Sequence, residues 1–224
     1  MHTPLKNVYY INLLHRTDRK EKIEHQLNEL KWDYQRYNAV KLPKSPSSSR
    51  IGCSLSHLSI LKEAHEKKLD YVVILEDDIK FIDTQSFNNR LELVLNDKTD
   101  FDVLLICTNA KKPLVQTSKY LAKAYDCQTT TGYIVKNHYF ETLIQNYTEG
   151  IQLLMKNPQH YYYYSIDMYW KKLQKKDNWY LIIPMEVYQE DGYSDIEKVH
   201  KNYYKIKKVL IYPLASNNSS ESDK

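Results

Sequence analysis

The chain has 224 residues and a formal net charge of +4, with 42% hydrophobic and 27% charged residues. These values suit a single globular domain with a sizeable core, and so small a charge gives no reason to expect a nucleic-acid partner. A glycine-rich phosphate loop is excluded, because the four glycines form neither GxGxxG nor GxxxxGK[ST].

The cysteines and the apolar stretches also limit the class of protein. Cys53, Cys107 and Cys127 show no CxxC spacing, so the sequence indicates neither a disulfide framework nor a zinc motif. No apolar stretch approaches the length of a membrane span, and the first residues lack the pattern of a signal peptide. We therefore expect a soluble, intracellular protein without a membrane span.

Strand and helix patterns alternate along the chain. Apolar residues three and four apart predict helices, and short runs of β-branched and aliphatic residues predict buried strands. In chain order we expect a strand at 8–13, a helix at 20–30, a strand at 34–40, a loop at 41–50, a helix at 51–69, a strand at 71–75, a helix at 86–95 and a strand at 102–106. A strand at 132–135, helices at 139–145 and 166–175 and a strand at 180–184 follow.

This alternation predicts an α/β fold. Helices would flank a central, mostly parallel sheet, and ligands would bind at the carboxyl ends of its strands. We expect one domain over residues 1–213 and a disordered polar tail at 214–224, which ends in SNNSSESDK.

Three adjacent carboxylates, Glu76, Asp77 and Asp78, directly follow the apolar strand at 71–75. Like charges this close raise one another's pKa, so the cluster is costly unless a cation or several donors compensate. In an extended segment Glu76 and Asp78 would face one side together, where they would bind Mn²⁺ or Mg²⁺, while Asp77 would turn toward another group. Without a glycine-rich loop, a nucleotide site would need such a cation.

Two other readings of the carboxylate cluster were weighed. The first is an ordinary solvated strand end, which is as good an explanation as a metal site when the cluster is considered alone. The second is a response-regulator receiver, which needs a phospho-accepting Asp at the end of a later strand. The later strand continues as DVLLICTNA and has no such Asp, so we reject the receiver.

Six segments together resemble glycosyltransferase family 25, which includes lipooligosaccharide glycosyltransferases and collagen hydroxylysine galactosyltransferases. They occur in the family's order and span nearly the whole chain, and the last is similar to the collagen-modifying branch. The segments are INLLHRTDR (11–19), IGCSLSHLSILKEA (51–64), VVILEDDIKF (72–81), TTGYIV (130–135), SIDMYW (165–170) and EDGYSDIE (190–197).

The resemblance implies a GT-A type, Rossmann-like nucleotide-sugar-binding fold and a metal-dependent enzyme. It also implies a UDP-galactose or UDP-glucose donor, inversion at the anomeric carbon and a hydroxyl acceptor, which would be a collagen-like peptide or a glycan. Two alternatives stay open: a non-catalytic relative that binds a nucleotide-sugar or glycan, and a metal-dependent phosphohydrolase.

Site roles follow from these segments. For the base that deprotonates the acceptor we expect Asp167, with Asp195 as its competitor, and for the metal Glu76 and Asp78. An acid at Asp167 is also explained by the first turn of a helix, with Ser165 as its cap. The expected donor-binding residues are Asn12, Arg16, Arg19, Ser56, His57, Asp77 and Thr130.

Overall fold

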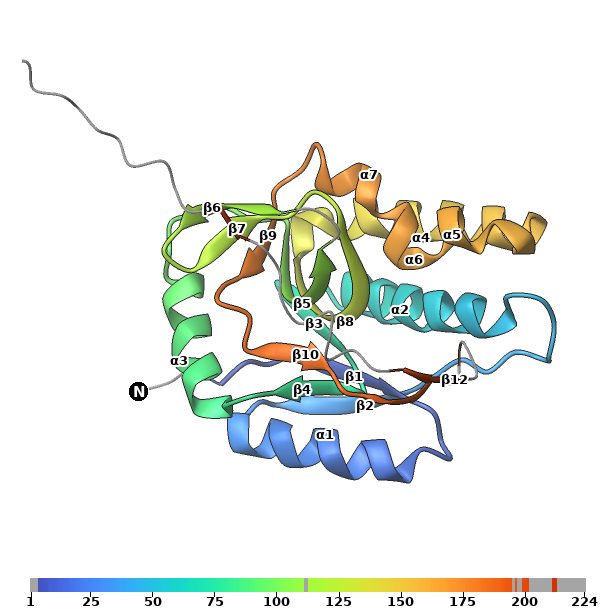
Figure 1. Ribbon diagram of the computed structural model, residues 1–224, viewed down its shortest axis with the longest axis horizontal. Helices are drawn as coiled ribbons and strands as arrows, with labels where there is room; N and C mark the ends of the chain where they lie inside the picture. The colour runs from blue at the N-terminus through green and yellow to red at the C-terminus, as the bar shows by residue number, and fades with distance from the viewer. Residues whose placement is uncertain (1–3, 111–112, 195, 197–198, 202–210, 213–224) are drawn as a thin grey trace, which may run out of the picture.

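A computed structural model describes residues 4–110, 113–194, 196, 199–201 and 211–212. Within them, a nine-stranded sheet has the order β13-β6-β7-β9-β5-β8-β3-β1-β2 (Figure 1). Its strands are β1 (Val8–Asn12), β2 (Tyr34–Asn38), β3 (Tyr71–Glu76), β5 (Val103–Ala110), β6 (Leu114–Ser118), β7 (Leu121–Lys123), β8 (Cys127–Lys136), β9 (Trp179–Ile182) and β13 (Ile211–Tyr212). The predicted tail at 214–224 and Asp195 lie outside the described residues.

Helices cover both faces of this sheet, so the predicted α/β class is confirmed. The helices are α1 (Thr17–Leu30), α2 (Ser48–Glu66), α3 (Thr84–Leu95), α4 (Phe140–Lys156), α5 (Tyr161–Tyr164), α6 (Ile166–Tyr169) and α7 (Lys171–Gln174), with 3₁₀ turns at Asn137–Tyr139 and Pro158–His160. Helices α1 and α3 contribute to one apolar core, and α2, α4, α6 and α7 to the other.

Alternating side chains of the strands divide the core in two. In β1, Tyr9 and Ile11 pack into the core under α2 and α4, while Val8 and Tyr10 pack into the core under α1 and α3. Successive side chains of a strand point to opposite faces, so a strand that is buried on both sides reads as a continuous apolar run. This explains why β1 and β3 were recognisable in the sequence.

The sheet is mixed in direction. Strand β1 is parallel to both of its neighbours, β2 and β3, and β5 is parallel to β9. Strand β8 lies between β3 and β5 and runs antiparallel to both, and the β6–β7 hairpin is also antiparallel. The parallel part therefore comes from the strand and helix alternation of the first third of the chain, whereas β8 was visible in the sequence only as a short strand.

Element boundaries differ from the predicted ones mainly where polar residues are helical. Helix α2 begins at Ser48, inside the segment predicted to be a loop, because Ser47 adopts a left-handed conformation directly before it. The predicted helix at 166–175 is two short helices, α6 and α7. The hairpin of β6 and β7 was not predicted, since its strands are short and only partly buried.

Two small antiparallel pairs complete the fold. Strand β4 (Ile79–Phe81) pairs with β10 (Val187–Gln189), and β11 (Gly192–Ser194) pairs with β12 (Val199–Lys201). The β4–β10 pair brings the segment after β10 against the turn that follows β3, where the Glu190 amide donates to the Asp78 carbonyl at 2.7 Å.

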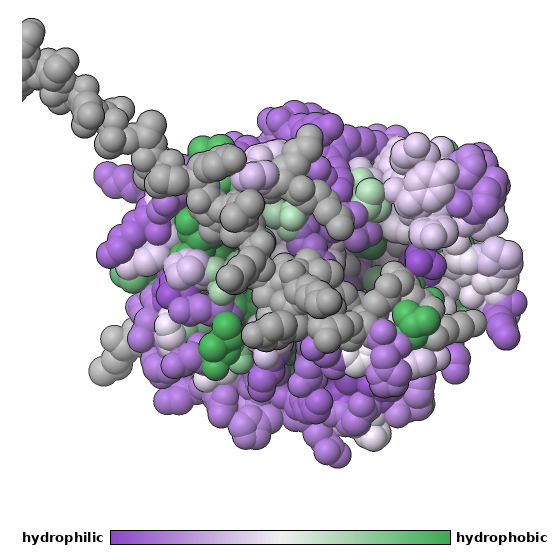
Figure 2. All heavy atoms as spheres, in the orientation of Figure 1, coloured by the Kyte–Doolittle hydropathy of each residue, from purple (hydrophilic) through white to green (hydrophobic). Residues whose placement is uncertain are grey.

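The face of the molecule in Figure 2 is mostly hydrophilic, with only scattered hydrophobic patches. In the part of the chain that the structure describes, no helix is both long enough and apolar enough to cross a membrane.

Candidate active site

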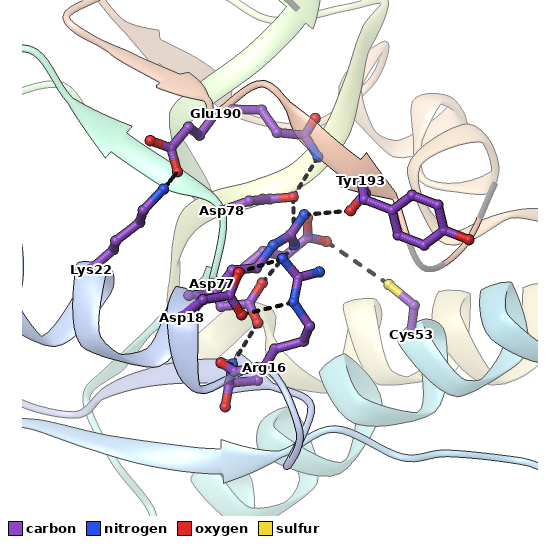
Figure 3. A network of polar contacts seen from close by, with 12 residues as sticks. Arg16, Asp18, Lys22, Cys53, Asp77, Asp78, Glu190 and Tyr193 are labelled. Atoms are coloured by element: carbon purple, nitrogen blue, oxygen red, sulfur yellow. Dashed lines mark hydrogen bonds and ion pairs between the residues drawn. The ribbon is translucent and has the colours of Figure 1, made fainter. Parts of the chain in front are cut away.

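The three carboxylates at the end of β3 point to three different partners. Strand β3 ends at Glu76, and Asp77 and Asp78 form a turn before β4 begins at Ile79. The expectation that Glu76 and Asp78 share one face of an extended segment is therefore wrong, because the turn breaks the strand alternation. Figure 3 shows Asp77 and Asp78 between α1, which carries Asp18, and Cys53 on α2.

Glu76 is held from the α2 and β8 side through one oxygen. Its Oε1 accepts a hydrogen bond from Thr130 Oγ1 at 2.6 Å and lies 3.4 Å from His57 Nε2 and 3.9 Å from Cys53 Sγ. Burial acts to raise the pKa of Glu76, but His57, Thr130 and the charge of Arg19 outweigh it, so the pKa is lowered. The hydrogen bonds found among the described residues all end on Oε1, which leaves Oε2 for another ligand.

Asp77 is held by β1 and α1. Its carboxylate accepts from Asn12 Nδ2 at 2.6 Å and from Arg19 Nη1 at 2.9 Å. The amide of Asn12 also donates to the Arg16 carbonyl and accepts from Arg36 Nε at 3.0 Å. Asn12 is 1% exposed and fully used in this way, so it positions Asp77 and does not reach a base edge as the sequence led us to expect.

Asp78 has one oxygen that is bonded and one that is not. Oδ2 accepts from Arg19 Nη1 at 3.1 Å and from Gln189 Nε2 at 3.0 Å. Oδ1 is buried and has no hydrogen-bond partner among the described residues. Burial, followed by the charge of Glu76, raises the pKa of Asp78 to about 7. A buried acceptor without a partner is unfavourable, so this oxygen indicates a missing ligand.

Arg19 is the counter-ion of the cluster. From α1 it contacts both Asp77 and Asp78, and its Nη2 donates to the Tyr193 carbonyl at 3.0 Å. Arg16, by contrast, forms a bidentate pair with Asp18, at 2.9 and 2.8 Å. Sequence reasoning gave both arginines to the donor, whereas in this structure one neutralises the acids and the other pairs at the start of α1.

A cavity of about 410 Å³ opens in front of these acids. Its wall combines the three carboxylates with cationic side chains and with part of the loop at 41–47. The lining residues include Glu76, Asp77, Asp78, Arg19, His15, Lys41, Lys44, Leu42, Ser48, Cys53, His57 and Gln189. The volume falls in the usual range for small-molecule sites, and the mixture of charges suits an anion held by a cation.

Helix α2 forms one wall of the cavity, and two of its small residues hold the chain at Val40. A Cβ added at Gly52 would lie 2.4 Å from the Val40 carbonyl oxygen, so only glycine fits there. Ser56 Oγ accepts from the Val40 amide at 2.8 Å and donates to the Gly52 carbonyl. Ser56 is 0% exposed and does not line the cavity, so it supports the wall rather than touching a donor.

His57 lines the cavity through a buried ring. Its Nδ1 lies 2.8 Å from Tyr133 Oη, which accepts from Tyr147 Oη at 3.1 Å. Gly132, beside Tyr133, has a packing reason: a Cβ there would lie 2.8 Å from Ile79 Cδ1. The segment at 130–135 therefore places Thr130 and Tyr133 around Glu76 and His57, and its glycine is required by the core.

Asp167 lies in α6, beside the same acids. Its Oδ2 accepts from the Thr129 amide at 3.1 Å. Burial and the charge of Glu76 raise the pKa of Asp167, while the Thr129 amide lowers it. Ser165 occupies the cap position of α6, but its side chain forms no capping hydrogen bond, so the expected cap is wrong.

Sequence reasoning missed several residues of this site. Gln189, Cys53 and Arg36 had no local signal, because each becomes relevant only through a contact with a distant segment. Lys41, Leu42 and Lys44 belong to a stretch that was recognised only as a loop. The preserved order of the six segments was the one available signal that 51–64 and 190–197 meet the carboxylates.

The comparison with protein families decides what kind of site this is. A family model described as "Glycosyltransferase family 25 (LPS biosynthesis protein)" matches residues 43–219, which is more than half of the chain. The chain belongs to glycosyltransferase family 25. Five of the six segments named above lie inside the matched range, and the segment at 11–19 precedes it.

Curated relatives of this family 25 chain include procollagen galactosyltransferase 1-B of Xenopus laevis, which is 34% identical over 127 residues. That match covers 44% of the chain and 20% of the relative. A glycosyltransferase 25 family member of Drosophila melanogaster is 26% identical over 162 residues, covering 58% of the chain and 26% of the relative. The matched part is therefore about a fifth to a quarter of these relatives' length.

The solved structures are more distant from the family 25 chain. A glycosyltransferase involved in the glycosylation of the major capsid of PBCV-1 is 11% identical, with a TM-score of 0.44, and the likeness covers 81% of the chain and 93% of that structure. A likeness at this level says nothing about the site, which rests on the contacts described above.

Proposed function

We propose that this family 25 chain transfers a hexose, galactose or glucose, from a UDP-sugar to a hydroxyl acceptor, with inversion and with the help of Mn²⁺ or Mg²⁺. The observation that supports it best is the buried, unpartnered Oδ1 of Asp78 beside a cavity lined by acids and cations. Collagen-like hydroxylysine and a glycan are the acceptor classes, in keeping with the procollagen galactosyltransferases among the relatives.

The residues present fit a hard divalent cation. Asp78 Oδ1 lacks a partner, and the described hydrogen bonds of Glu76 all use its other oxygen. Oxygen ligands suit Mn²⁺ and Mg²⁺, so these two carboxylates would hold the ion. When bound, the ion would stabilise the charge that develops on the departing diphosphate.

The cationic side chains of the wall have a role of their own. His15, Arg19, Lys41 and Lys44 line the same cavity as the acids. Guanidinium and ammonium groups match phosphate oxygens, and in a partly enclosed site such pairs are stronger than in water. We expect Lys41 and Lys44, on the loop before α2, to contact the diphosphate, and Arg19 to shift toward it from the acids.

Asp167 is our candidate base. Burial raises its pKa, which favours a group that accepts a proton near neutral pH, and it lies near Glu76, whose charge contributes to the shift. Asp195, its competitor, lies outside the described residues. The base would take the proton from the acceptor hydroxyl as the oxygen attacks the anomeric carbon.

A donor assay tests this proposal. The protein is incubated with UDP-galactose or UDP-glucose and Mn²⁺, and released UDP and free hexose are measured by chromatography. We expect metal-dependent turnover that falls about a hundredfold or more in Asp78→Asn, as is typical when an electrostatic stabiliser is removed. Asp33→Asn, at an exposed position remote in sequence, is the matched control.

The other outcomes identify the alternatives. Binding of UDP-sugar without turnover by any donor would overturn the enzyme and leave a non-catalytic binding relative. Release of inorganic phosphate instead of UDP and hexose would indicate a phosphohydrolase.

A further inference from the structure

Three different donor atoms meet on the α2 side of the cavity. Cys53 and His57 are one turn apart on α2, and Glu76 ends β3 opposite them. Sγ, Nε2 and Oε1 all lie within 4.8 Å of one another. The measured pairs are 3.9 Å for sulfur to oxygen and 3.4 Å for nitrogen to oxygen. Figure 3 shows the thiol of Cys53 directed from α2 toward the carboxylates.

These separations fit a tetrahedral zinc ion. Bonds of about 2.3 Å to sulfur and about 2.0 to 2.2 Å to nitrogen and oxygen place tetrahedral ligands about 3.6 Å apart for sulfur and oxygen. For nitrogen and oxygen the same bonds give about 3.4 Å. One separation already matches, and the other needs a shift of a few tenths of an ångström.

The donor set selects the kind of metal. Thiolate and imidazole favour Zn²⁺, Co²⁺ and similar ions, whereas Mn²⁺ and Mg²⁺ prefer sites made of oxygen. Cys53, His57 and Glu76 therefore differ in chemistry from the Glu76 and Asp78 pair, although the two sites share Glu76.

The outer shell of this cluster is already in place. Thr130 Oγ1 donates to Glu76 Oε1 at 2.6 Å and fixes that carboxylate. The far nitrogen of His57 lies 2.8 Å from the hydroxyl of Tyr133, which can accept its proton when Nε2 binds a metal. His57 and Tyr133 are both 0% exposed, so the ring cannot turn freely. Such outer contacts orient metal ligands and strengthen their binding.

The fourth position of the site faces open space. Cys53, His57 and Glu76 all line the cavity of about 410 Å³, so an ion held by them would be reachable from it and would keep room for water. Three protein ligands and one open position are the pattern of exchangeable zinc sites rather than closed structural ones.

We propose that Cys53, His57 and Glu76 form a binding site for a thiophilic divalent cation of the Zn²⁺ class. Binding releases the thiol proton to solvent and leaves the thiolate, the imidazole and the carboxylate as ligands. Because it withdraws Glu76 from Asp78, this cation inhibits the metal-dependent transfer, a consequence that rests on the proposed function.

The test uses Co²⁺ alone as a spectroscopic probe of the whole chain. Cysteine-bound Co²⁺ gives a near-ultraviolet charge-transfer band and, in a tetrahedral site, strong visible bands. We expect both in the wild-type protein, with displacement of Co²⁺ by Zn²⁺ at one equivalent. Calorimetric titration of Zn²⁺ in buffers of different ionisation enthalpy should show proton release.

Two variants and one control separate this site from other thiols. Cys53→Ser and Cys53→Ala should lose the charge-transfer band and bind Zn²⁺ about tenfold or more weakly. Cys127→Ser removes a buried thiol that does not line the cavity and should keep the band. Melting curves confirm that each variant is folded, and Cys53, being only half-buried, tolerates both changes.

A wild-type Co²⁺ spectrum without the thiolate band, or one unchanged in both Cys53 variants, would overturn the site. The readout needs no UDP-sugar, so it is independent of transferase activity. If the band appears and no donor is turned over, the cation site stands and the proposed function falls.

Discussion

Three neighbouring carboxylates acquire different properties from their surroundings. Glu76 has its pKa lowered by His57 and Thr130 despite burial, whereas burial raises the pKa of Asp77 and raises that of Asp78 to about 7. Asp77 is fully engaged by Asn12 and Arg19, and Asp78 keeps an unpartnered oxygen. Pairs of acids whose environments differ in this way are typical of functional sites.

Asp78→Asn should separate stability from function. In the metal-free protein the change removes a desolvated charge whose Oδ1 has no partner, so we expect an unchanged or higher melting temperature. Differential scanning calorimetry of the metal-free protein measures this, with Asp33→Asn as the surface control. A fall of several degrees in the Asp78 variant alone would show that the ionised carboxylate stabilises the fold.

At the scale of elements, two contacts bring the site together. Strands β4 and β10 pair, which carries Gln189 to Asp78 from a distance of 111 residues in the chain. Helix α2 approaches the chain at Val40 so closely that Gly52 has no room for a side chain, and Ser56 completes the contact. The wall that carries Cys53 and His57 is therefore placed by a backbone contact.

Gly52→Ala should disturb this wall. The added Cβ would lie 2.4 Å from the Val40 carbonyl oxygen, which is a backbone atom and moves only with its segment. We expect a loss of about 1 to 3 kcal/mol in the free energy of unfolding, measured by urea denaturation. Gly192→Ala is the matched control, because a Cβ there meets nothing within 4 Å. Equal stability of the two variants would contradict the close approach.

For the whole molecule, the sequence predicted the alternation of strands and helices and the position of the acids. It did so because β1 and β3 are buried on both faces, which gives unbroken apolar runs before Asn12 and Glu76. Strands β6 and β7 were not predicted, since such short pairs are specified by their neighbours. The counter-ion Arg19 was assigned to the donor, because no local pattern shows that α1 turns it toward β3.

The same limit explains the cation site on α2. Cys53 and His57 are four residues apart, but their third ligand is on another element, so no spacing motif exists. Long-range contacts of this kind are set by the packing of α2 against the sheet, and sequence periodicity alone does not predict them.

The central claim is that these acids and the cavity bind a uridine diphosphate through a hard cation. Calorimetric titration of UDP into wild-type protein and Asp78→Asn, each with and without Mn²⁺, tests it most directly. We predict that the wild-type protein binds UDP with Mn²⁺, and that omitting Mn²⁺ or replacing Asp78 weakens binding about tenfold or more. Equal binding of UDP in all four titrations, or no binding in any, would contradict the account.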